Sequence, residues 1–267
     1  MSTNWKITAL RYATMTERIR ANNFLFDDDH AAPHPIDFFI WLLEADGRRI
    51  LVDTGYDRTE SVARERPIDH APEDMLRARG IDPDTIETVI LTHLHFDHAG
   101  SLKAFPNAQL FVQPAEMEYA TGPCMCHDAL RMPFTGDHVC DMVRALFMGR
   151  VTFVEGSAEV APGVEVHLIG GHSRGLQAVR VQTRRGPVVL ASDASHFYEN
   201  YLKRKLFPIV VDAEDMLRGF DRLQALAPTL AHIVPGHDPL VLSAYPQDGG
   251  PDAVSLHADP DESVLGF

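Results

Sequence analysis

The sequence predicts a layered α/β protein in which two mixed β-sheets lie between outer helices. Several predicted strands are nearly continuous apolar runs, such as Pro-Val-Val-Leu at residues 187–190, and strands of this kind are buried on both faces. One predicted helix, at residues 213–226, gathers its apolar side chains on a single face and can therefore cover a sheet. Strands buried on both faces need a layer on each side, so two packed sheets with helices outside them satisfy the pattern economically.

The strands are predicted from short apolar runs that end at turn-forming residues. Residues 37–44 and 49–53 form two such runs, and Asp46 and Gly47 between them indicate a hairpin. The remaining strands are expected, in chain order, at residues 87–91, 108–112, 151–154, 164–169, 178–183, 187–192 and 230–234. Helices are expected at residues 72–79, 99–104, 114–119 and 213–226.

Residues 114–150 differ from the rest of the chain because their apolar side chains show weak periodicity. Methionine, phenylalanine and cysteine gather in this segment (Cys124, Met125, Cys126, Met132, Phe134, Cys140, Met142, Phe147 and Met148). Such adaptable side chains favour a pocket lid or a subunit interface, with ordinary core packing as the alternative. No repeat or low-complexity linker divides the sequence, so one domain over residues 1–267 is predicted. The adaptable side chains of residues 114–150 favour a homodimer.

Composition and charge argue against several classes of partner. The chain has 267 residues, of which 45% are hydrophobic and 23% charged, as in an ordinary globular protein. Its net charge of −14 argues against a nucleic-acid partner. The N-terminus lacks the apolar core of a signal peptide, and no stretch approaches the ~18 apolar residues of a membrane span. A cytoplasmic protein without a membrane partner is therefore expected.

The three cysteines predict neither a disulfide framework nor a metal site. Their number is odd, and Cys124 and Cys126 lack the distant matching pair of a thiolate zinc site. A partly buried, apolar wall is the expected role of this stretch.

The most informative stretch is His-Leu-His-Phe-Asp-His at residues 93–98, directly after the apolar residues 89–91. It offers four potential metal ligands in six positions. A structural histidine usually occurs alone, and a solvated loop rarely repeats histidine. A tight turn with three imidazoles and one carboxylate suits one or two borderline metal ions.

Three further residues, His172, Asp193 and His237, each follow an apolar strand. Each alone would more often be structural or exposed, but strand ends along one edge of a sheet gather in space. The glycines beside His172 and His237 allow close approach of the backbone. With residues 93–98 they supply five histidines and two aspartates (His93, His95, Asp97, His98, His172, Asp193 and His237). This set suffices for two metal ions with three ligands each, a bridging carboxylate and a bridging water.

These motifs resemble the metallo-β-lactamase superfamily. The resemblance runs over about residues 35–240 and includes Asp53, in Ile-Leu-Val-Asp-Thr-Gly at residues 50–55, which matches an early aspartate motif. It implies an αββα sandwich of two mixed sheets flanked by helices. It further implies one metal ion held by His93, His95 and His172, a second held by Asp97, His98 and His237, a bridging Asp193, and an Asp53 that orients a ligand without binding metal.

Histidine and carboxylate ligands without thiolate fit Zn²⁺, and iron, manganese and cobalt are also acceptable. Two cations about 3.5–4 Å apart can bring the pKa of a bridging water from about 15.7 to about 7, which makes deprotonation roughly 12 kcal/mol easier. The resulting hydroxide would attack a polarised carbonyl, and Asp97 or Asp193 would transfer the proton. Hydrolysis of an acyl or phosphoryl compound is the reaction class implied.

Within the superfamily, the sequence most resembles the N-acyl homoserine lactonases, which implies opening of the ester ring of a small lactone. Residues 95–100, 171–173, 192–195 and 235–238 carry this resemblance. Those lactonases commonly have a tyrosine three residues after the bridging aspartate, where this chain has His196. We therefore expect His196 to donate a hydrogen bond to the substrate carbonyl, with Tyr198 as a substitute. Arg174 is expected either to anchor an acidic substrate tail or to be an exposed loop residue.

Three alternatives remain open at this point. A thioesterase of the glyoxalase II type usually adds a basic C-terminal helical region, whereas the residues after His237 are acidic and predicted to be loop-like. A hydrolase of a cyclic amide or imide is chemically adjacent, and no residue excludes it. A metal-binding regulatory or scaffold protein is disfavoured, because a non-catalytic protein has no physical reason to keep seven ligands and an open water position.

Overall fold

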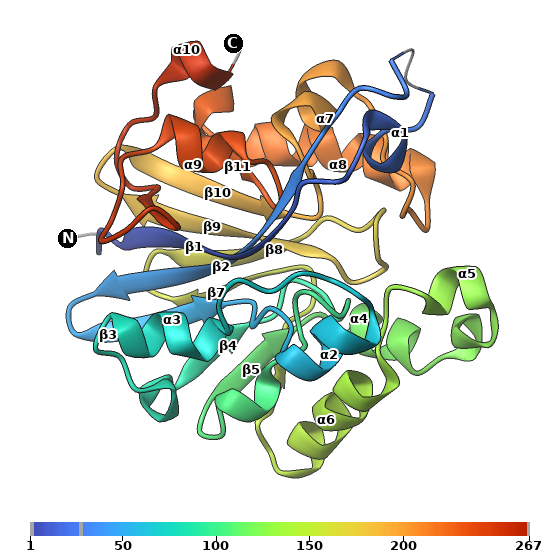
Figure 1. Ribbon diagram of the computed structural model, residues 1–267. Helices are drawn as coiled ribbons and strands as arrows, with labels where there is room; N and C mark the ends of the chain where they lie inside the picture. Colours follow the sequence, from blue (N-terminus) through green and yellow to red (C-terminus); the bar gives the residue numbers. More distant parts are fainter. Residues whose placement is uncertain (1–2, 27–28, 266–267) are drawn as a thin grey trace.

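The computed structural model of the protein describes residues 3–26 and 29–265. Residues 1–2, 27–28 and 266–267 of the predicted domain lie outside the described residues. Within the described ranges, a seven-stranded and a five-stranded sheet pack together between outer helices (Figure 1). The predicted architecture of two sheets flanked by helices is thus confirmed. None of the helices in these ranges has the length and apolar character needed to cross a membrane.

Both sheets are mixed, as predicted. The larger sheet contains β1 (Lys6–Met15), β2 (Ile36–Ala45), β3 (Arg48–Val52), β4 (Thr88–Ile90), β5 (Gln109–Val112), β6 (Val151–Phe153) and β12 (Ala253–Ser255), in the order β12-β1-β2-β3-β4-β5-β6. The smaller sheet contains β7 (Ser157–Ala161), β8 (Val164–Leu168), β9 (Gln177–Thr183), β10 (Gly186–Ser192) and β11 (Ile233–Pro235), in the order β11-β10-β9-β8-β7. In the larger sheet the pairs from β3 to β6 are parallel and the others antiparallel. In the smaller sheet only β10 and β11 pair in parallel.

Helices lie on both sides of the paired sheets (Figure 1). On one side are α2 (Arg58–Ala63), α3 (Pro72–Ala78), α4 (Pro114–Ala120) and α6 (Gly136–Phe147). On the other are α7 (Tyr198–Lys203), α8 (Ala213–Leu226), α9 (Leu240–Ala244) and α10 (Glu262–Leu265). Two short helices, α1 (Arg20–Asn23) and α5 (Asp128–Arg131), lie at the periphery.

Strand β2 shows why two layers of cover are needed. Its odd-numbered apolar side chains, such as Trp41, pack in a core shared with the smaller sheet and α8. Its even-numbered side chains, such as Ile40, pack in a second core with α3, α4 and α6. Successive side chains of a strand point to opposite faces, so a strand that is apolar throughout requires a partner layer on each side.

Several sequence predictions are confirmed and others are wrong. Strands β2 and β3 pair antiparallel across Asp46 and Gly47, and α8 spans the predicted residues 213–226. The helix predicted at residues 99–104 is reduced to a 3₁₀ turn at Leu102–Ala104, because Gly100 N donates to Gly55 O at 2.7 Å instead of entering a helix. The strand predicted at residues 230–234 begins only at Ile233, after a 3₁₀ turn at Leu230–His232.

The C-terminal segment is not loop-like, contrary to the prediction. It contains α9, β12 and α10, and β12 pairs with β1 at the edge of the larger sheet. A three-residue strand is stabilised by its neighbour, so its own sequence carries little pattern. Likewise, β1, β7 and α6 are not predicted, although α6 buries Met142 and Ala145 within the weakly periodic segment.

Candidate metal centre

The predicted metal ligands come from loops that meet at one edge of the paired sheets. Residues 93–98 follow β4, His172 follows β8, Asp193 follows β10 and His237 follows β11. Strands β8, β10 and β11 run in the same direction, so their ends lie at the same edge. The predicted close approach beside His237 is confirmed, since a Cβ at Gly236 would lie 2.7 Å from the backbone of Ser192.

Among the described residues, three groups place ligand atoms within 4.8 Å of one another, and the third shares one residue with each of the other two. The first group comprises His93, His95 and His172, together with Asp193, and the second group comprises Asp97, His98 and His237. A third combination joins Asp193 and His237 to His196. The structure therefore brings together all seven residues predicted as metal ligands, and none of the cysteines belongs to these groups.

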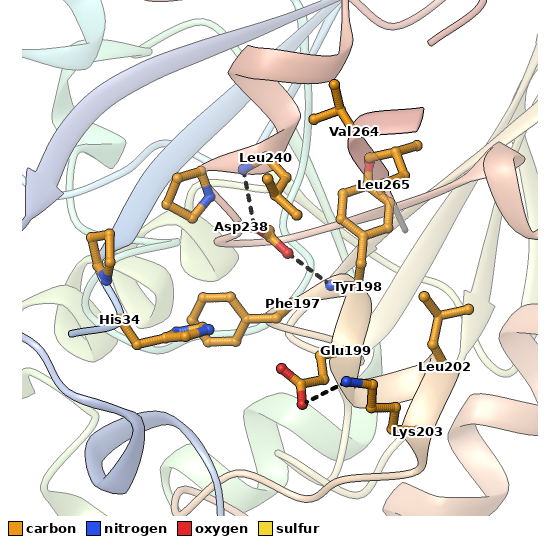
Figure 2. A pocket seen from close by; sticks show the side chains of 12 residues that line it. His34, Phe197, Tyr198, Glu199, Leu202, Lys203, Asp238, Leu240, Val264 and Leu265 are labelled. Carbon is orange, nitrogen blue, oxygen red and sulfur yellow. Dashed lines mark hydrogen bonds and ion pairs between the residues drawn. The ribbon is translucent and has the colours of Figure 1, made fainter. Parts of the chain in front are cut away.

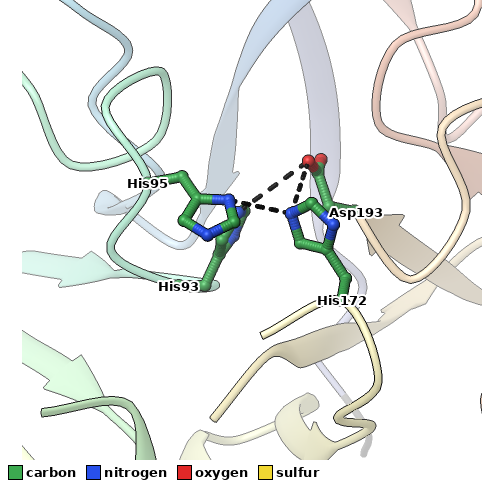
Figure 3. Close-up of side chains that lie close together, drawn as sticks. All are labelled: His93, His95, His172 and Asp193. Carbon is green, nitrogen blue, oxygen red and sulfur yellow. Dashed lines mark hydrogen bonds and ion pairs between the residues drawn. The ribbon is translucent and has the colours of Figure 1, made fainter. Parts of the chain in front are cut away.

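Asp193 lies between the two groups and turns one oxygen toward each. Its Oδ2 lies 3.2 Å from His172 Nε2 and 3.8 Å from His93 Nε2 (Figure 3). Its Oδ1 lies 3.2 Å from His98 Nε2 and 3.0 Å from His237 Nε2. This is the arrangement that a carboxylate shared by two cations requires.

The remaining ligand atoms complete the two groups. His95 Nδ1 lies 2.9 Å from His172 Nε2 in the first group (Figure 3). In the second group, Asp97 Oδ2 lies 3.8 Å from both His98 Nε2 and His237 Nε2. Each group thus presents several donors to a small common volume.

Hydrogen bonds on the outer side of two rings fix which nitrogen faces the cluster as an acceptor. His172 Nδ1 lies 2.7 Å from the carbonyl oxygen of Ile209, and His237 Nδ1 lies 2.7 Å from that of Asp37. A carbonyl oxygen can only accept, so Nδ1 of each ring carries the proton. The Nε2 atoms, which face Asp193, keep their lone pairs free for a cation.

Asp53 performs the same task for His98 with a side-chain carboxylate. It is fully buried, and its Oδ2 lies 2.7 Å from His98 Nδ1. Thr92 holds the carboxylate through its backbone N at 2.7 Å and its Oγ1 at 2.8 Å. Asp53 has a φ of 60°, a left-handed conformation that non-glycine residues rarely adopt, and this sharp bend after β3 turns the carboxylate toward His98.

Buried polar atoms without partners test whether the cluster fits a cation. Within the described part of the chain, His93 Nε2, His98 Nε2 and Asp193 Oδ1 are buried and make no hydrogen bond. Leaving a buried polar atom unsatisfied costs about 1–3 kcal/mol. Coordination of a cation would remove this cost, and imidazole and carboxylate are suitable donors for divalent transition metals. The residues present therefore fit a metal centre.

The two groups differ in their electrostatics. Burial lowers the pKa of His93 and of His95 well below the usual value, so both rings are neutral at pH 7, as metal ligands must be. Burial acts in the same direction on His98 and His237, but the nearby carboxylates of Asp193 and Asp97 together outweigh it and raise both pKa values, with Asp53 contributing at His98. His98 and His237 are consequently more basic than His93 and His95.

His196 lies at the edge of the cluster. Its Nε2 is 2.9 Å from Asp193 Oδ2, and its ring stacks on Phe207 with a centroid separation of 3.6 Å and an interplanar angle of 14°. Burial lowers the pKa of His196 to about 3. The ring is therefore neutral at pH 7, and its single N–H, at Nε2, donates to the Asp193 carboxylate.

The other two predicted substrate contacts lie away from the cluster. Tyr198 is buried and lines a separate cavity of about 420 Å³. Asp238 accepts hydrogen bonds there from Tyr198 N and Leu240 N, both at 2.9 Å (Figure 2). Arg174 is exposed, with its guanidinium 5.7 Å from the ring centroid of Tyr119, as expected for a loop residue.

Some groups at the centre carry no readable sequence signal. The carbonyl oxygens of Asp37 and Ile209 hold ligand rings, but any residue supplies a carbonyl, so only the fold reveals them. Phe134 packs edge-on against His95 with ring centroids 4.7 Å apart. Its segment, residues 114–150, is singled out by its composition, but nothing in the sequence distinguishes Phe134 from the other apolar residues there.

Comparisons of sequence place this chain among well-defined relatives. The sequence model of the metallo-beta-lactamase superfamily matches residues 39–241. An N-acyl homoserine lactonase of a Bacillus species is 30% identical over 223 residues, which cover 76% of this chain and 82% of that protein. A homologous lactonase of Azorhizobium caulinodans is 31% identical over 177 residues, which cover 61% of this chain and 62% of that protein.

Solved structures that resemble this chain include proteins of the same kind as its relatives in sequence. The crystal structure of a quorum-quenching N-acyl homoserine lactone lactonase matches with a TM-score of 0.73 and 28% identity, over 90% of this chain and 94% of that chain. An N-acyl homoserine lactone hydrolase with N-hexanoyl-L-homoserine bound at its catalytic metal center also has a TM-score of 0.73, with 27% identity over 90% of this chain and 95% of that chain.

Proposed function

This chain belongs to the metallo-β-lactamase superfamily, and on that premise we propose that it is a metal-dependent hydrolase that opens the ester ring of a small lactone. N-acyl homoserine lactones are the proposed substrate class, because the similar proteins are lactonases and hydrolases of these compounds. The observation that carries the proposal is the position of Asp193, which turns one oxygen toward each of two groups of buried ligands.

Two divalent cations are the proposed cofactors. One would be held by the first group, the other by the second group, and Asp193 would be shared between them. The unpartnered nitrogens of His93 and His98 support this assignment. The donors fit Zn²⁺, and iron, manganese and cobalt accept the same donors. When bound, such a pair of cations lowers the pKa of a water to about 7 and polarises a carbonyl.

Asp97 is the proposed proton-transfer group. Its side chain is 12% exposed, whereas that of Asp193 is 4% exposed, so solvent reaches Asp97 more readily. Burial alone would raise the pKa of Asp193, but His237 and His98 outweigh it and hold that pKa well below its usual range. Asp193 is therefore a poor proton acceptor, and Asp97 would take the proton of water and return it to the leaving alcohol.

His196 is the proposed donor of a hydrogen bond to the lactone carbonyl. Its neutral ring has one N–H, which at Nε2 donates to Asp193 Oδ2 at 2.9 Å, and this N–H would turn to the lactone carbonyl when cations take up that carboxylate oxygen. Stacking on Phe207 restricts rotation of the ring. A donor that is already oriented stabilises charge developing on a carbonyl oxygen without reorganisation during the reaction.

Residues 114–150 are proposed as a wall of the substrate pocket within a single domain. Phe134 packs against His95, and Phe96 N donates to the carbonyl oxygen of Pro133 at 2.9 Å. The segment therefore contacts the loop of residues 93–98 directly.

Phe147 and Met148 are largely exposed, in keeping with the prediction of a homodimer. The cytoplasmic location likewise stays a prediction.

A glutathione thioesterase fits this chain less well than a lactonase does. Glutathione is an anionic peptide, and its carboxylates are usually bound by cationic side chains. Residues 238–267 contain neither lysine nor arginine, and within the described residues they fold as two short helices and the edge strand β12.

The proposal is tested by metal analysis together with a pH-indicator hydrolysis screen. The screen contains short and long N-acyl homoserine lactones, simple γ- and δ-lactones and S-lactoylglutathione. We expect about two metal ions per chain and lactone opening with kcat/KM of about 10⁴ M⁻¹s⁻¹ or higher. If the protein bound two metal ions but hydrolysed only S-lactoylglutathione, it would be a thioesterase and not a lactonase. Absence of both metal and turnover would refute the proposal.

A further inference from the structure

One buried carboxylate beside the cluster is not among its proposed ligands. Glu116, in the first turn of α4, is 0% exposed. It accepts three hydrogen bonds, and all three donors lie on the two loops that carry the first group. Burial of a carboxylate is unfavourable unless its oxygens are satisfied, so these three bonds link the position of Glu116 to that of the loops.

The first contact is with the loop of residues 93–98. Glu116 Oε1 accepts a hydrogen bond of 3.0 Å from Leu94 N. Leu94 stands between His93 and His95, and its own side chain is buried. The bond therefore fixes the backbone from which both imidazoles project.

The second contact is with the loop that follows β8. Glu116 Oε2 accepts hydrogen bonds from Ser173 Oγ at 2.5 Å and from Gly175 N at 2.9 Å. Ser173 directly follows His172. The two oxygens of one carboxylate thus hold the two loops whose histidines form the first group.

The packing of Gly175 shows that the second loop lies directly on the backbone of α4. A Cβ at Gly175 would lie 2.3 Å from Glu116 N and 2.4 Å from Glu116 Cβ. No other residue type fits such a close approach. Glu116 therefore sets the separation of the two loops. Its side chain binds the loop of residues 93–98, and its backbone packs against Gly175 in the loop that follows β8.

We propose that Glu116 is a positioning residue that joins the two loops of the first group and so sets the affinity of that group for a cation. The inference rests on the proposed function, because it takes His93, His95 and His172 as metal ligands. Losing a group that positions metal ligands typically weakens metal binding about 10–100-fold. The second group has a separate anchor in Asp53 and should be unaffected.

The test is to measure the two Zn²⁺ binding steps of the variant Glu116→Gln. The amide keeps the shape of the side chain but presents an NH₂ group where an oxygen accepts hydrogen bonds. Metal-free protein is titrated with Zn²⁺ in competition with a chromogenic chelator. The variants His172→Ala and His237→Ala, each lacking one ligand, assign the steps to the first and second groups. In Glu116→Gln we expect Zn²⁺ binding to be about 10–100-fold weaker in the step that His172→Ala weakens. We expect the affinity of the other step to be unchanged.

Two further variants provide the controls. Glu118→Gln makes the same chemical change on the same helix at an exposed position, and we expect it to bind both ions as the wild type does. Ser173→Ala removes one bond to Glu116 and should give a smaller shift in the same step. It provides the decisive measurement if Glu116→Gln does not fold, and the thermal unfolding of each metal-free variant checks this.

The outcomes separate this inference from the proposed function. Equal weakening of both steps would indicate a general structural role and overturn the inference. Unchanged Zn²⁺ binding in Glu116→Gln would also overturn it. If Glu116→Gln does not fold, unchanged binding in Ser173→Ala would do so instead. A wild-type protein that binds no Zn²⁺ or other divalent transition metal would overturn the proposed function as well. Wild-type binding of two ions without a selective effect of Glu116→Gln would overturn the role of Glu116 alone.

Discussion

Asp53 and Glu116 are buried carboxylates behind opposite halves of the same cluster, and they contact it in different ways. Asp53 contacts a ring, with its Oδ2 2.7 Å from His98 Nδ1. Glu116 contacts two backbone N–H groups and one hydroxyl, but no ring. A carboxylate on an imidazole raises the basicity of the ring as well as orienting it, whereas a bond to the backbone fixes position alone.

The two groups also differ in how many carboxylates surround their histidines. The second group contains Asp97 and is backed by Asp53, whereas the first group contains histidines only and relies on the shared Asp193. Burial lowers the pKa of His93, and it acts in the same way on His98, where Asp193, Asp97 and Asp53 together outweigh it and raise the pKa. We infer that the first group depends mainly on geometry for its affinity, and the second on charge and geometry together.

The variant Asp193→Asn should have the largest effect, because it removes the charge that both groups share. Breaking a buried charge interaction by removing one partner costs about 3–5 kcal/mol. If lactone opening loses the same free energy, kcat/KM falls by about 150- to 5,000-fold at 1.36 kcal/mol per tenfold, and we expect both Zn²⁺ binding steps to weaken. Asp221→Asn, at an exposed position on α8, is the matched control. If only one Zn²⁺ binding step weakened, Asp193 would belong to one group only, and the two groups would not share it.

The variant His196→Ala should have the next largest effect, because it removes the proposed donor to the carbonyl. Loss of one preorganised donor typically lowers kcat about 100-fold or more, and we expect a drop of about 100-fold in kcat/KM with both Zn²⁺ affinities retained. Steady-state kinetics on the best lactone and chelator competition measure the two quantities, with the exposed His127→Ala as control. Weaker metal binding with proportionate loss of activity would instead make His196 a support for Asp193.

The variant Asp53→Asn should mirror Glu116→Gln on the other half of the cluster. The amide cannot accept from both His98 and Thr92 as the carboxylate does, so the ring of His98 loses its fixed orientation. We expect the Zn²⁺ step of the second group to weaken about 10–100-fold, while the step of the first group stays unchanged. Chelator competition on both variants gives a direct comparison, and equal weakening of both steps by Asp53→Asn would contradict independent anchors.

The sequence predicts the parts of the cluster whose chemistry is unusual. The dense motif at residues 93–98 and the isolated His172, Asp193 and His237 after apolar strands lead to the same set of seven residues that lie together in the structure. Imidazoles repeated this densely are typical of metal binding. Asp53 is different, because an aspartate after a strand is common, and only the resemblance to a family distinguishes it from other aspartates.

Glu116 could not be predicted, because a glutamate in the first turn of a helix is ordinary at an exposed position. Its burial follows from the packing of Gly175 on α4, a contact between residues far apart in the chain. The failed helix at residues 99–104 has a similar cause, since Gly100 N donates to Gly55 O. Local sequence indicates local preference, whereas these features depend on tertiary contacts.

Glu199 shows how a carboxylate behaves when surface cations hold it instead of buried donors. It accepts hydrogen bonds from Arg20 Nη2 and Lys205 Nζ, both at 2.9 Å. Burial would raise its pKa, but the bonds from Arg20 and Lys205 outweigh burial and lower the pKa from 4.5 to about 2. Because the folded pKa lies below the unfolded value, the stability from this group is present above pH 4.5 and is lost as the pH falls toward about 2.

The variant Glu199→Gln should therefore have the smallest effect and a distinct dependence on pH. Solvent screens this partly exposed site, so we expect the free energy of unfolding at pH 7 to fall by at most about 1 kcal/mol. The difference from the wild type should shrink toward zero as the pH approaches about 2. Urea unfolding of both metal-free proteins at pH 7 and near pH 3 measures it, because metal release in acid would otherwise dominate the comparison. A difference that persisted unchanged in acid would show that packing rather than charge holds Glu199, and that the buried and surface carboxylates are more alike than their surroundings indicate.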